Sequence, residues 1–462
     1  MKKLRIFVLL LVLALVAAAC GGDSEETTTT AAEGGMDETT TTTAAPDEGG
    51  TEETTTTAGE MPAEIKTDFG VDLDAGTITI GQLADLTSPN FSALVNPIID
   101  GQKLYFDYIN ANGGINGLMI EMLPKDTQYS SELHIQAYEE IRDQVVAISH
   151  GTGSSTNLAI ADQLFEDKMI LVPATWYSGW TDTEIAPGVV HTGASYCIEA
   201  MNLLDWMKDE SGLDAPTLAL ASLPGDFGLD SMAGAQKWAE INGIEYVDAG
   251  IGKIIPGQDN KPIGDAIVAS GADIVFVTAP PSLFSEVYGT AVGQGFEAMW
   301  SGAGPTYNPA FLSSPLADAI QRDWYGGFYS QPWGSESAGM ALVHQLYDEA
   351  GSEEPLKDYI ALGVVEAMIV ENALRKAYEN GDLTREGVFN ALYSFDSMEF
   401  MGMAPAERYT GSTADQVQRA LTLYRPSAAD FAAGGSGAVI VDPEFVGPTA
   451  ESFEFTEACW SF

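Results

Sequence analysis

The sequence predicts an α/β protein of two lobes, each a doubly wound parallel sheet with helices on both faces. Short apolar stretches alternate with amphipathic ones through most of the chain, which is typical of repeated strand–helix–strand units. After a low-complexity N-terminal region, roughly 400 residues remain, more than a single hydrophobic core usually serves. Two lobes are therefore expected.

The clearest strand–helix–strand unit lies near the start of this part. An apolar strand at 77–83 precedes the stretch GQKLYFDYINANGGING at 101–117, where apolar residues recur at helical spacing. Gly101 leaves room for the helix backbone to approach a sheet closely. The Asn-Gly-Gly at 112–114 ends the helix, because glycine accepts a left-handed conformation. A second apolar strand follows at 118–123, so the two strands are parallel.

The same alternation continues towards the C-terminus. Further strands are predicted at 144–149, 169–172, 217–221, 244–249, 274–277, 299–301, 421–424 and 438–441. Helices are predicted at 132–142, 158–166, 199–208, 231–241, 340–349 and 359–379. Strands separated by helices predict parallel sheets covered on both faces.

Residues 1–19 have the pattern of a signal peptide. Three basic residues precede an apolar run at 6–19, which is shorter than the ~20 residues that a membrane span needs. The run ends in Ala-Ala-Ala-Cys20, which is similar to a bacterial lipobox, where the cysteine is lipidated. An ordinary signal peptide with an incidental cysteine is the alternative.

Residues 20–63 are predicted to be a disordered linker behind the lipidated Cys20. Runs of Thr with Glu, Gly and Ala leave almost no apolar surface to bury, so the conformational entropy lost on ordering this segment would not be compensated. The sequence leaves open whether the linker carries sugar.

The net charge of the chain restricts the classes of partner that it can bind. The formal net charge of −47 excludes a general nucleic-acid binder and disfavours contact with anionic lipid, so membrane contact is expected through the N-terminal lipid only.

Besides Cys20 the chain has Cys197 and Cys459. Export permits a disulfide between them, but the spacing leaves open whether they pair.

The GGING turn, together with the order of the elements around it, resembles the branched-chain amino acid binding proteins. These are extracytoplasmic receptors of ABC importers with the type I periplasmic binding fold, and the resemblance covers roughly 77–441. It implies a monomer with a small-molecule ligand, permease partners and a hinge of three crossing segments. The corresponding division is lobe 1 at 77–193 plus 334–400 and lobe 2 at 194–329 plus 405–445.

Ligands of open parallel sheets bind at the carboxyl ends of the strands, which directs attention to the loop at 151–157. Its glycines allow close backbone approach, and Ser154 and Ser155 offer hydroxyls. Because a helix follows, free N–H groups and the helix dipole would favour a carboxylate, although a plain helix cap is the alternative. In the resemblance, Gly153 matches the serine that binds the ligand carboxylate, which leaves the backbone, Ser154 and Ser155 as donors.

The resemblance assigns two further contact regions. Ala174, Thr175 and Trp176 match a loop that offers a backbone carbonyl and a hydroxyl to the ligand's ammonium and carboxylate. Phe227 stands where the family has a tyrosine, so the ring is retained and the hydroxyl is lost.

The charge pattern departs from the family. Typical members place a glutamate after a later strand to pair with the ligand ammonium, but 301–308, SGAGPTYN, has no acid. An unpaired buried ammonium costs several kcal/mol, roughly, so an ordinary α-amino acid is in doubt. Asp85 is the best replacement acid, although a cap for its own loop is the favoured interpretation.

Several aromatic residues fall in the loops that would bound the cleft. They are Trp176, Tyr177, Trp180, Tyr307 and Trp333. Each alone is more typical of a core, but together they indicate a flat, apolar or aromatic ligand, or a cation held by ring faces.

Enzymatic motifs do not occur in the sequence. It contains no HExxH, CxxC or GxSxG, and Gly151-Thr152-Gly153 is not followed by the Gly-Lys-Ser/Thr of a P-loop. His150 lies near Ser154 but is interpreted as structural. The expected protein has no cofactor or metal. It is an extracytoplasmic, lipid-anchored solute-binding protein of an ABC importer, with an amino-acid-like, amide or aromatic ligand. A ligand-sensing lipoprotein and, less favoured, an extracytoplasmic enzyme are the alternatives.

Overall fold

The structure, a computed structural model, describes residues 64–182 and 184–462, apart from the side chain of Asp226. The predicted signal peptide, Cys20 and linker lie outside the described residues. Within the described part, no helix combines the length and the apolar character that crossing a membrane requires.

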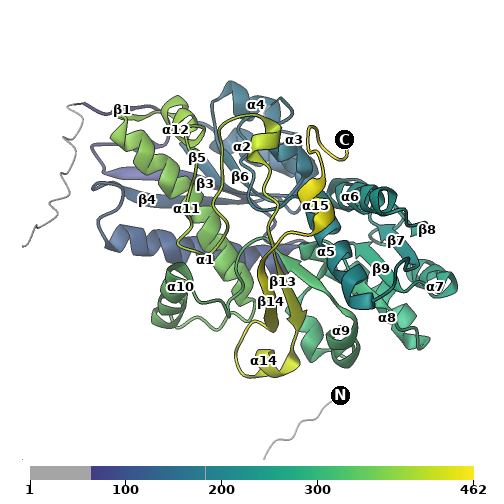
Figure 1. Ribbon diagram of the computed structural model, residues 1–462. Helices are drawn as coiled ribbons and strands as arrows, with labels where there is room; N and C mark the ends of the chain where they lie inside the picture. Colours follow the sequence, from purple (N-terminus) through teal and green to yellow (C-terminus); the bar gives the residue numbers. More distant parts are fainter. Residues whose placement is uncertain (1–63, 183) are drawn as a thin grey trace, which may run out of the picture. The chain divides into compact units, whose positions relative to one another are not determined.

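The first lobe is organised around β3, the strand predicted at 77–83. β3 pairs in parallel with β4 and β5, β5 pairs in parallel with β6, and the short β2 joins β3 antiparallel (Figure 1). The strands are β2 Val71–Asp72, β3 Thr77–Ala84, β4 Met119–Asp126, β5 Ala147–Thr152 and β6 Leu171–Ala174. Neighbouring residues such as Ala147 and Ile148 belong to two separate hydrophobic clusters, so both faces of the sheet are covered.

Helices from distant parts of the chain cover these two faces. One face carries α1 Ser92–Ala111, α10 Ala338–Glu349, α11 Lys357–Glu379 and α12 Arg385–Leu392, and the other carries α2 Ser131–Ile141, α3 Ser154–Leu158 and α4 Ala161–Glu166. Helices after residue 334 therefore pack on the first-lobe sheet.

The helix predicted from Gly101 begins earlier in the structure, at Ser92, with Pro97 inside it. The helix accommodates Pro97 within its first two turns, although a proline removes one backbone hydrogen bond of a helix interior.

Gly101 brings its helix close to α11, and the prediction of a close approach to the sheet is wrong. A Cβ atom on Gly101 would lie 2.1 Å from the carbonyl oxygen of Ile360, and one on Gly363 of α11 would lie 2.0 Å from the carbonyl oxygen of Ile98. Both distances are shorter than any real Cβ contact. α1 and α11 therefore cross with their backbones in direct contact (Figure 1).

The second lobe contains a parallel sheet of strand order β10-β9-β7-β8. Its strands are β7 Leu218–Ser222, β8 Tyr246–Gly250, β9 Ile274–Thr278 and β10 Met299–Ser301, and its helices are α5 Tyr196–Ser211, α6 Asp226–Asn242, α7 Lys261–Ser270, α8 Pro281–Gly293 and α9 Ala317–Asp323. The predicted loop before α6 is shorter than expected, so Phe227 lies on the first turn of this helix. The two-lobed parallel α/β fold predicted from the sequence is confirmed.

The chain passes between the lobes three times. It does so between η1 Ser178–Thr181 and α5, between β11 and α10, and between α12 and β13 (Figure 1). Next to the second lobe, β11 Gly326–Phe328, β13 Leu421–Pro426 and β14 Ala438–Phe445 form an antiparallel sheet. The remaining elements are β1 Lys66–Thr67, β12 Asp382–Leu383, η2 Gly304–Thr306, η3 Pro309–Ser313, α13 Thr413–Gln416, α14 Ala428–Ala432 and α15 Pro448–Ser452.

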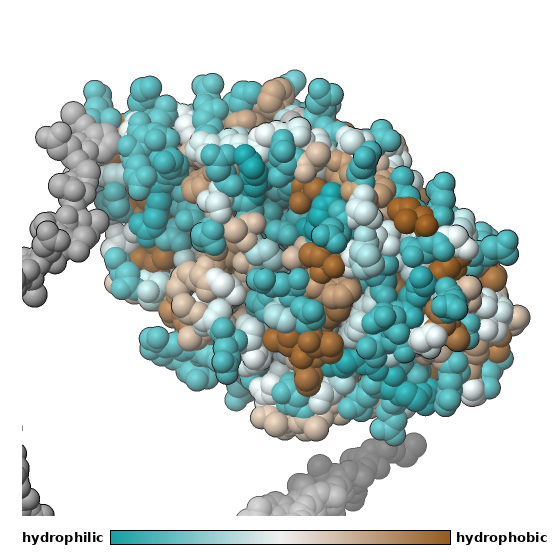
Figure 2. Space-filling model, viewed as in Figure 1, coloured by the Kyte–Doolittle hydropathy of each residue, from teal (hydrophilic) through white to brown (hydrophobic). Residues whose placement is uncertain are grey.

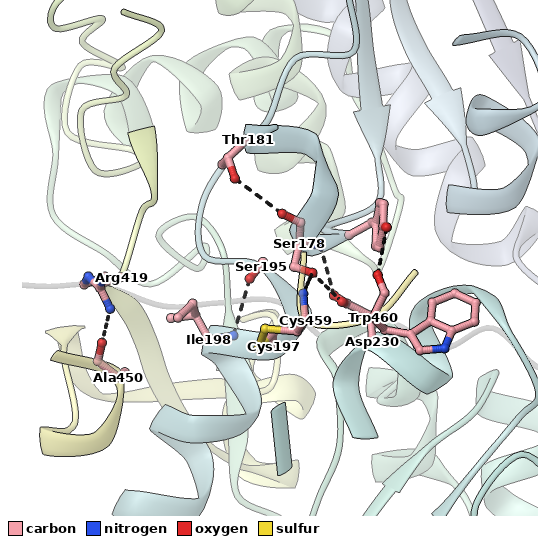
Figure 3. The surroundings of a disulfide bond; sticks show 11 residues. Ser178, Thr181, Ser195, Cys197, Ile198, Asp230, Arg419, Ala450, Cys459 and Trp460 are labelled. Atoms are coloured by element: carbon pink, nitrogen blue, oxygen red, sulfur yellow. Dashed lines mark hydrogen bonds between the residues drawn. A yellow bond between two sulfur atoms is a disulfide. The ribbon is translucent and has the colours of Figure 1, made fainter. Parts of the chain in front are cut away.

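A disulfide answers the question that the cysteine spacing left open. Cys197 on α5 is bonded to Cys459, with their Cα atoms 6.3 Å apart (Figure 3). Beside it, the N–H of Cys459 donates to the hydroxyl oxygen of Ser178 at 2.8 Å, and the Tyr177 hydroxyl donates to the carbonyl oxygen of Trp460 at 2.8 Å. The C-terminal segment is thus tied both to the second lobe and to the chain leaving β6.

The face of the molecule in Figure 2 is largely hydrophilic over both lobes, with small separate apolar areas. Exposed apolar side chains such as Val439 and Val441 on β14 are the exception. This surface agrees with a highly charged, water-exposed protein.

Replacing Gly101 with alanine should destabilise the first lobe. The new methyl group would meet the α11 backbone, which cannot move aside without separating the helices, so the free energy of unfolding should fall by about 2 kcal/mol. Chemical denaturation measures this change.

Gly289, inside α8, is the matched control, because the nearest atom to a Cβ there lies 3.9 Å away. Gly289→Ala should leave the free energy of unfolding unchanged or raise it by up to about 1 kcal/mol. Equal losses in the two variants would contradict the α1–α11 crossing.

Candidate functional site

A cavity lies where α1 and the strand ends of the first lobe meet the second lobe. α1 contributes Leu94, Val95 and Ile98, and Phe91 immediately precedes this helix. The ends of first-lobe strands and the loops after them contribute Tyr129, Thr152, Gly153, Ala174, Thr175 and Trp176. The remaining lining residues are Tyr196, Phe227, Pro305 and Tyr359. Within the described part of the chain, no charged side chain lines it. The location agrees with the rule that parallel sheets bind ligands at the carboxyl ends of their strands.

The start of α1 supplies an apolar wall. Phe91, Leu94, Val95 and Ile98 recur at helical spacing, so they share the face of α1 that points to the cavity. At one end, the Phe91 ring lies edge-on to those of Tyr129 and Phe227, with centroid distances of 4.8 Å and 5.8 Å. An apolar group of a ligand would be surrounded here by rings and aliphatic chains.

Three hydroxyl groups meet on the polar side of the cavity. The Thr175 Oγ1 atom lies 2.5 Å from Ser154 Oγ and 3.1 Å from the Tyr196 hydroxyl oxygen. They come from the end of β6, from α3 and from the first turn of α5, and all three residues are buried. Since a hydroxyl can donate or accept, this cluster can rearrange its hydrogen bonds around a polar ligand group.

Trp176 adds a buried donor. Its indole N–H has no hydrogen-bond partner among the described residues, although the side chain is buried and lines the cavity. The ring is stacked on Tyr329, with centroids 3.6 Å apart and planes 12° apart. An unpaired buried donor costs about 1–3 kcal/mol, so an acceptor on a ligand would be bound favourably here.

A buried acid holds this aromatic wall from behind. The Tyr329 hydroxyl donates to Glu199 Oε2 at 2.6 Å, and the Gly304 N–H donates to Glu199 Oε1 at 2.9 Å. Burial raises the pKa of Glu199 to about 8, and these two hydrogen bonds offset only part of that increase. Glu199 therefore positions Tyr329, and through it Trp176, without lining the cavity itself.

Thr152 is fixed by contacts from two elements. The two ring nitrogens of His150 lie 2.8 Å from Thr152 Oγ1 and 2.9 Å from Glu366 Oε2 on α11, and the Asp85 N–H donates to Thr152 Oγ1 at 3.1 Å. His150 is buried and holds the end of β5 in place, which agrees with its interpretation as structural.

Five of the residues predicted to bind ligand line this cavity: Gly153, Ala174, Thr175, Trp176 and Phe227. Ser154 is buried beside Thr175, and the partly buried Ser155 lies on α3 outside the lining. A Cβ on Gly153 would lie 2.7 Å from the Tyr129 ring, and its φ is +92°. The glycine in place of the family's serine thus makes room for Tyr129.

Asp85 and Tyr307 lie outside the lining. The Asp85 carboxylate accepts hydrogen bonds from the N–H of Ser88 at 3.0 Å, from the Ser88 hydroxyl at 2.5 Å and from the Phe91 N–H at 3.2 Å. It thereby holds the loop that leads into α1, as the favoured interpretation had it. Tyr307 lies in a second, smaller cavity.

The helix predicted at 158–166 begins later in the structure, as the six-residue α4. The five-residue α3 occupies most of the predicted loop before it. Such short helices have weak dipoles, so the predicted dipole contribution at Gly153 does not apply. Hydroxyls and the indole N–H remain as donors.

Much of the cavity wall was not predicted. The α1 residues were missed because the helix was started too late, and Tyr129, Tyr196, Pro305 and Tyr359 carry no distinguishing local signal. Tyr177, Trp180 and Trp333 were expected near the cleft but lie outside the lining. Tyr177 and Trp180 pack in the first lobe, and the Trp333 ring is tilted against that of His344, with centroids 4.1 Å apart.

Two wound lobes joined by three crossings, with a cavity at the strand ends between them, define the class of type I periplasmic binding proteins. The chain belongs to the periplasmic binding protein family, whose profile matches residues 77–431. It is thus an extracytoplasmic solute-binding protein of the ABC-transporter type, as the resemblance predicted. No curated protein sequence gives a significant match.

Solved structures give the same class. A fatty acid ABC transporter substrate-binding protein from Thermomonospora curvata is 25% identical, with a TM-score of 0.78 over 85% of this chain and 98% of that one. A branched chain amino acid ABC transporter from Thermus thermophilus with bound valine is 18% identical, with a TM-score of 0.69 over 81% and 98%. A solute binding protein from Rhodopseudomonas palustris HaA2 in complex with p-hydroxybenzoic acid is 16% identical, with a TM-score of 0.66 over 80% and 97%.

The raised pKa of Glu199 predicts that stability falls as pH rises. The folded protein keeps this proton up to about pH 8, whereas the unfolded chain releases it near the ordinary value of 4.5. The stability that the protonated Glu199 carboxyl gives the folded protein is therefore complete below the pKa of the unfolded chain. It is lost as pH rises through the pKa of the folded protein. Glu199→Gln should flatten the decline of the unfolding free energy between these values by up to about 1.4 kcal/mol per pH unit.

Urea unfolding of both forms at several pH values measures this slope. Tryptophan emission should shift in Glu199→Ala, which loses the acceptor for Tyr329, and stay close to wild type in the glutamine variant. Parallel stability profiles of wild type and Glu199→Gln would contradict the assignment.

Proposed function

We propose that this protein binds a carboxylic acid with a long apolar body, a fatty acid in the first place, and delivers it to an ABC permease. The observation that carries this proposal is the cavity itself. Its walls are mostly apolar, its polar side consists of hydroxyls and an unpaired indole N–H, and no described charged side chain lines it. Such a site suits a ligand that has one hydrogen-bond-accepting head group on an apolar body.

The same observation weighs against an α-amino acid. A ligand ammonium needs an acidic partner, because burying it alone costs several kcal/mol, roughly. Two acids beside the cavity wall are engaged elsewhere: Asp85 holds its own loop, and Glu199 accepts hydrogen bonds from Tyr329 and Gly304. Of the classes that the sequence suggested, amides and aromatic acids remain as competing ligands for the test.

Similarity supports the fatty acid. The substrate-binding protein from Thermomonospora curvata is described as a fatty acid protein and is 25% identical over 85% of this chain.

The orientation follows from the lining. The head group is placed at Thr175, Tyr196 and Trp176, where the donors are. The chain extends along α1 towards Ile98 and Tyr359. Each buried CH₂ group contributes about 0.8 kcal/mol, so affinity should increase with chain length until the cavity is full.

Anchoring is proposed from the sequence. Cleavage of the signal peptide before Cys20 and lipidation of this residue would attach the monomer to the outer side of the cell membrane, with residues 21–63 as a tether. The acidic character of the chain, with a formal net charge of −47 over all 462 residues, disfavours further contact with anionic lipid.

Isothermal titration with saturated fatty acids of increasing length tests this function. Affinity should increase with chain length and exceed that for valine, for fatty amides and for p-hydroxybenzoic acid. Thr175→Val keeps the side-chain shape and removes the central hydroxyl, so fatty acid affinity should fall about fivefold to tenfold.

The control for this variant is Thr278→Val at the end of β9. That buried hydroxyl also pairs with a serine, Ser231, at 3.0 Å, but lies outside the cavity. It should leave affinity unchanged. Tighter binding of valine or of an amide than of any fatty acid would overturn the proposal.

A further inference from the structure

Residues 448–462 contact both lobes. At the start of this segment, in α15, the Thr449 N–H donates to Asp205 Oδ2 on α5 of the second lobe at 2.7 Å. Further along, Trp460 packs against the first-lobe hydrophobic cluster that contains Tyr177. The Tyr177 hydroxyl donates to the carbonyl oxygen of Trp460 at 2.8 Å. The segment therefore passes from the second lobe to the first.

Hydrogen bonds at Ser178 connect the lobes at the same place (Figure 3). Ser178 begins η1, which precedes the first crossing. Its N–H donates to Asp230 Oδ2 on α6 of the second lobe at 2.9 Å, and its hydroxyl donates to the other oxygen of this carboxylate. The same hydroxyl oxygen accepts the N–H of Cys459 at 2.8 Å. Separating the lobes here would break these hydrogen bonds.

The disulfide holds the segment beside these hydrogen bonds. Cys197 lies in the first turn of α5, directly after the first crossing, and is bonded to Cys459. The third crossing is attached to the segment as well, because the Arg419 guanidinium donates to the carbonyl oxygen of Phe453 at 2.9 Å and to that of Ala450. The segment is thus joined to the chain at two of the three crossings.

We propose that residues 448–462 form a strap across the hinge, which holds the two lobes close together, and that the Cys197–Cys459 bond keeps this strap in place. When the lobes move apart, Tyr177 has to leave Trp460, because the disulfide holds the strap against α5 and prevents it from following the first lobe. The strap therefore shifts the equilibrium between open and closed forms towards the closed form. This inference concerns the separation of the lobes and does not depend on which ligand the protein binds.

The distance between the lobes in the ligand-free protein tests this inference. We would introduce p-acetylphenylalanine at Phe165 of α4 and Tyr246 of β8, which are 43% and 39% exposed. Nitroxide labels attached to these ketones leave the cysteines intact, and double electron–electron resonance measures the distance between the labels. Tyr177→Phe keeps the disulfide and removes one hydrogen bond of the strap, so the ratio of the open to the closed population should rise about fivefold.

Cys197→Ala combined with Cys459→Ala removes the covalent attachment and should raise the same ratio at least as much. Circular dichroism shows whether this double variant is folded, and if it is not, Tyr177→Phe decides alone. Tyr288→Phe is the matched control, since it removes a buried hydroxyl that bonds Asp323 at 2.8 Å within the second lobe, and it should leave the ratio unchanged. Wild-type populations in Tyr177→Phe, or an equal change in the control, would overturn the strap.

Discussion

The backbone contact between α1 and α11 is the constraint on which the rest of the ligand site depends. Gly101 and Gly363 let the two helices cross so closely that each glycine faces the other helix's carbonyl oxygen. This crossing fixes the first turns of α1 against the strand ends, where Leu94 to Ile98 form the apolar wall. It also places the start of α11, with Tyr359, at the far end of the same space. A helix pair far apart in sequence thereby determines both the width and the length of the cavity.

The second lobe completes the site with few groups. Tyr196, Phe227 and Pro305 come from it. Tyr196 and Phe227 contact cavity residues of the first lobe, the Thr175 hydroxyl and the Phe91 ring, and the turn at Pro305 is held through the Gly304–Glu199 hydrogen bond. A ligand that touches both lobes favours the arrangement in which they are close together, and this differential contact is the physical basis for closure in such receptors. The disulfide at Cys197 lies one residue from Tyr196, so the C-terminal segment is anchored next to this lobe's contribution.

The fold could be predicted from the sequence because strand and helix patterns repeat and because the GGING turn carries a family resemblance. Gly153, Thr175 and Trp176 could be predicted because they follow neighbouring strands of the first-lobe sheet, whose carboxyl ends meet at one edge. Phe227, in the second lobe, was predicted from the family resemblance. The α1 wall could not be predicted, since the helix was recognised only from the apolar spacing at 101–117, downstream of the wall residues. Tyr196 and Tyr359 come from helices whose approach to the cleft depends on tertiary packing. The unpaired indole N–H of Trp176 is likewise a property of the packed structure and leaves no trace in local sequence.

The central claim is that apolar contact, with a few neutral donors, holds the ligand in this protein. Its most direct test is the heat-capacity change of fatty acid binding, obtained from isothermal titrations at several temperatures. Removal of the chain and the α1 wall from water predicts a clearly negative value that grows in magnitude with chain length. A value near zero, independent of chain length, would show that the chain stays in water and would contradict the account.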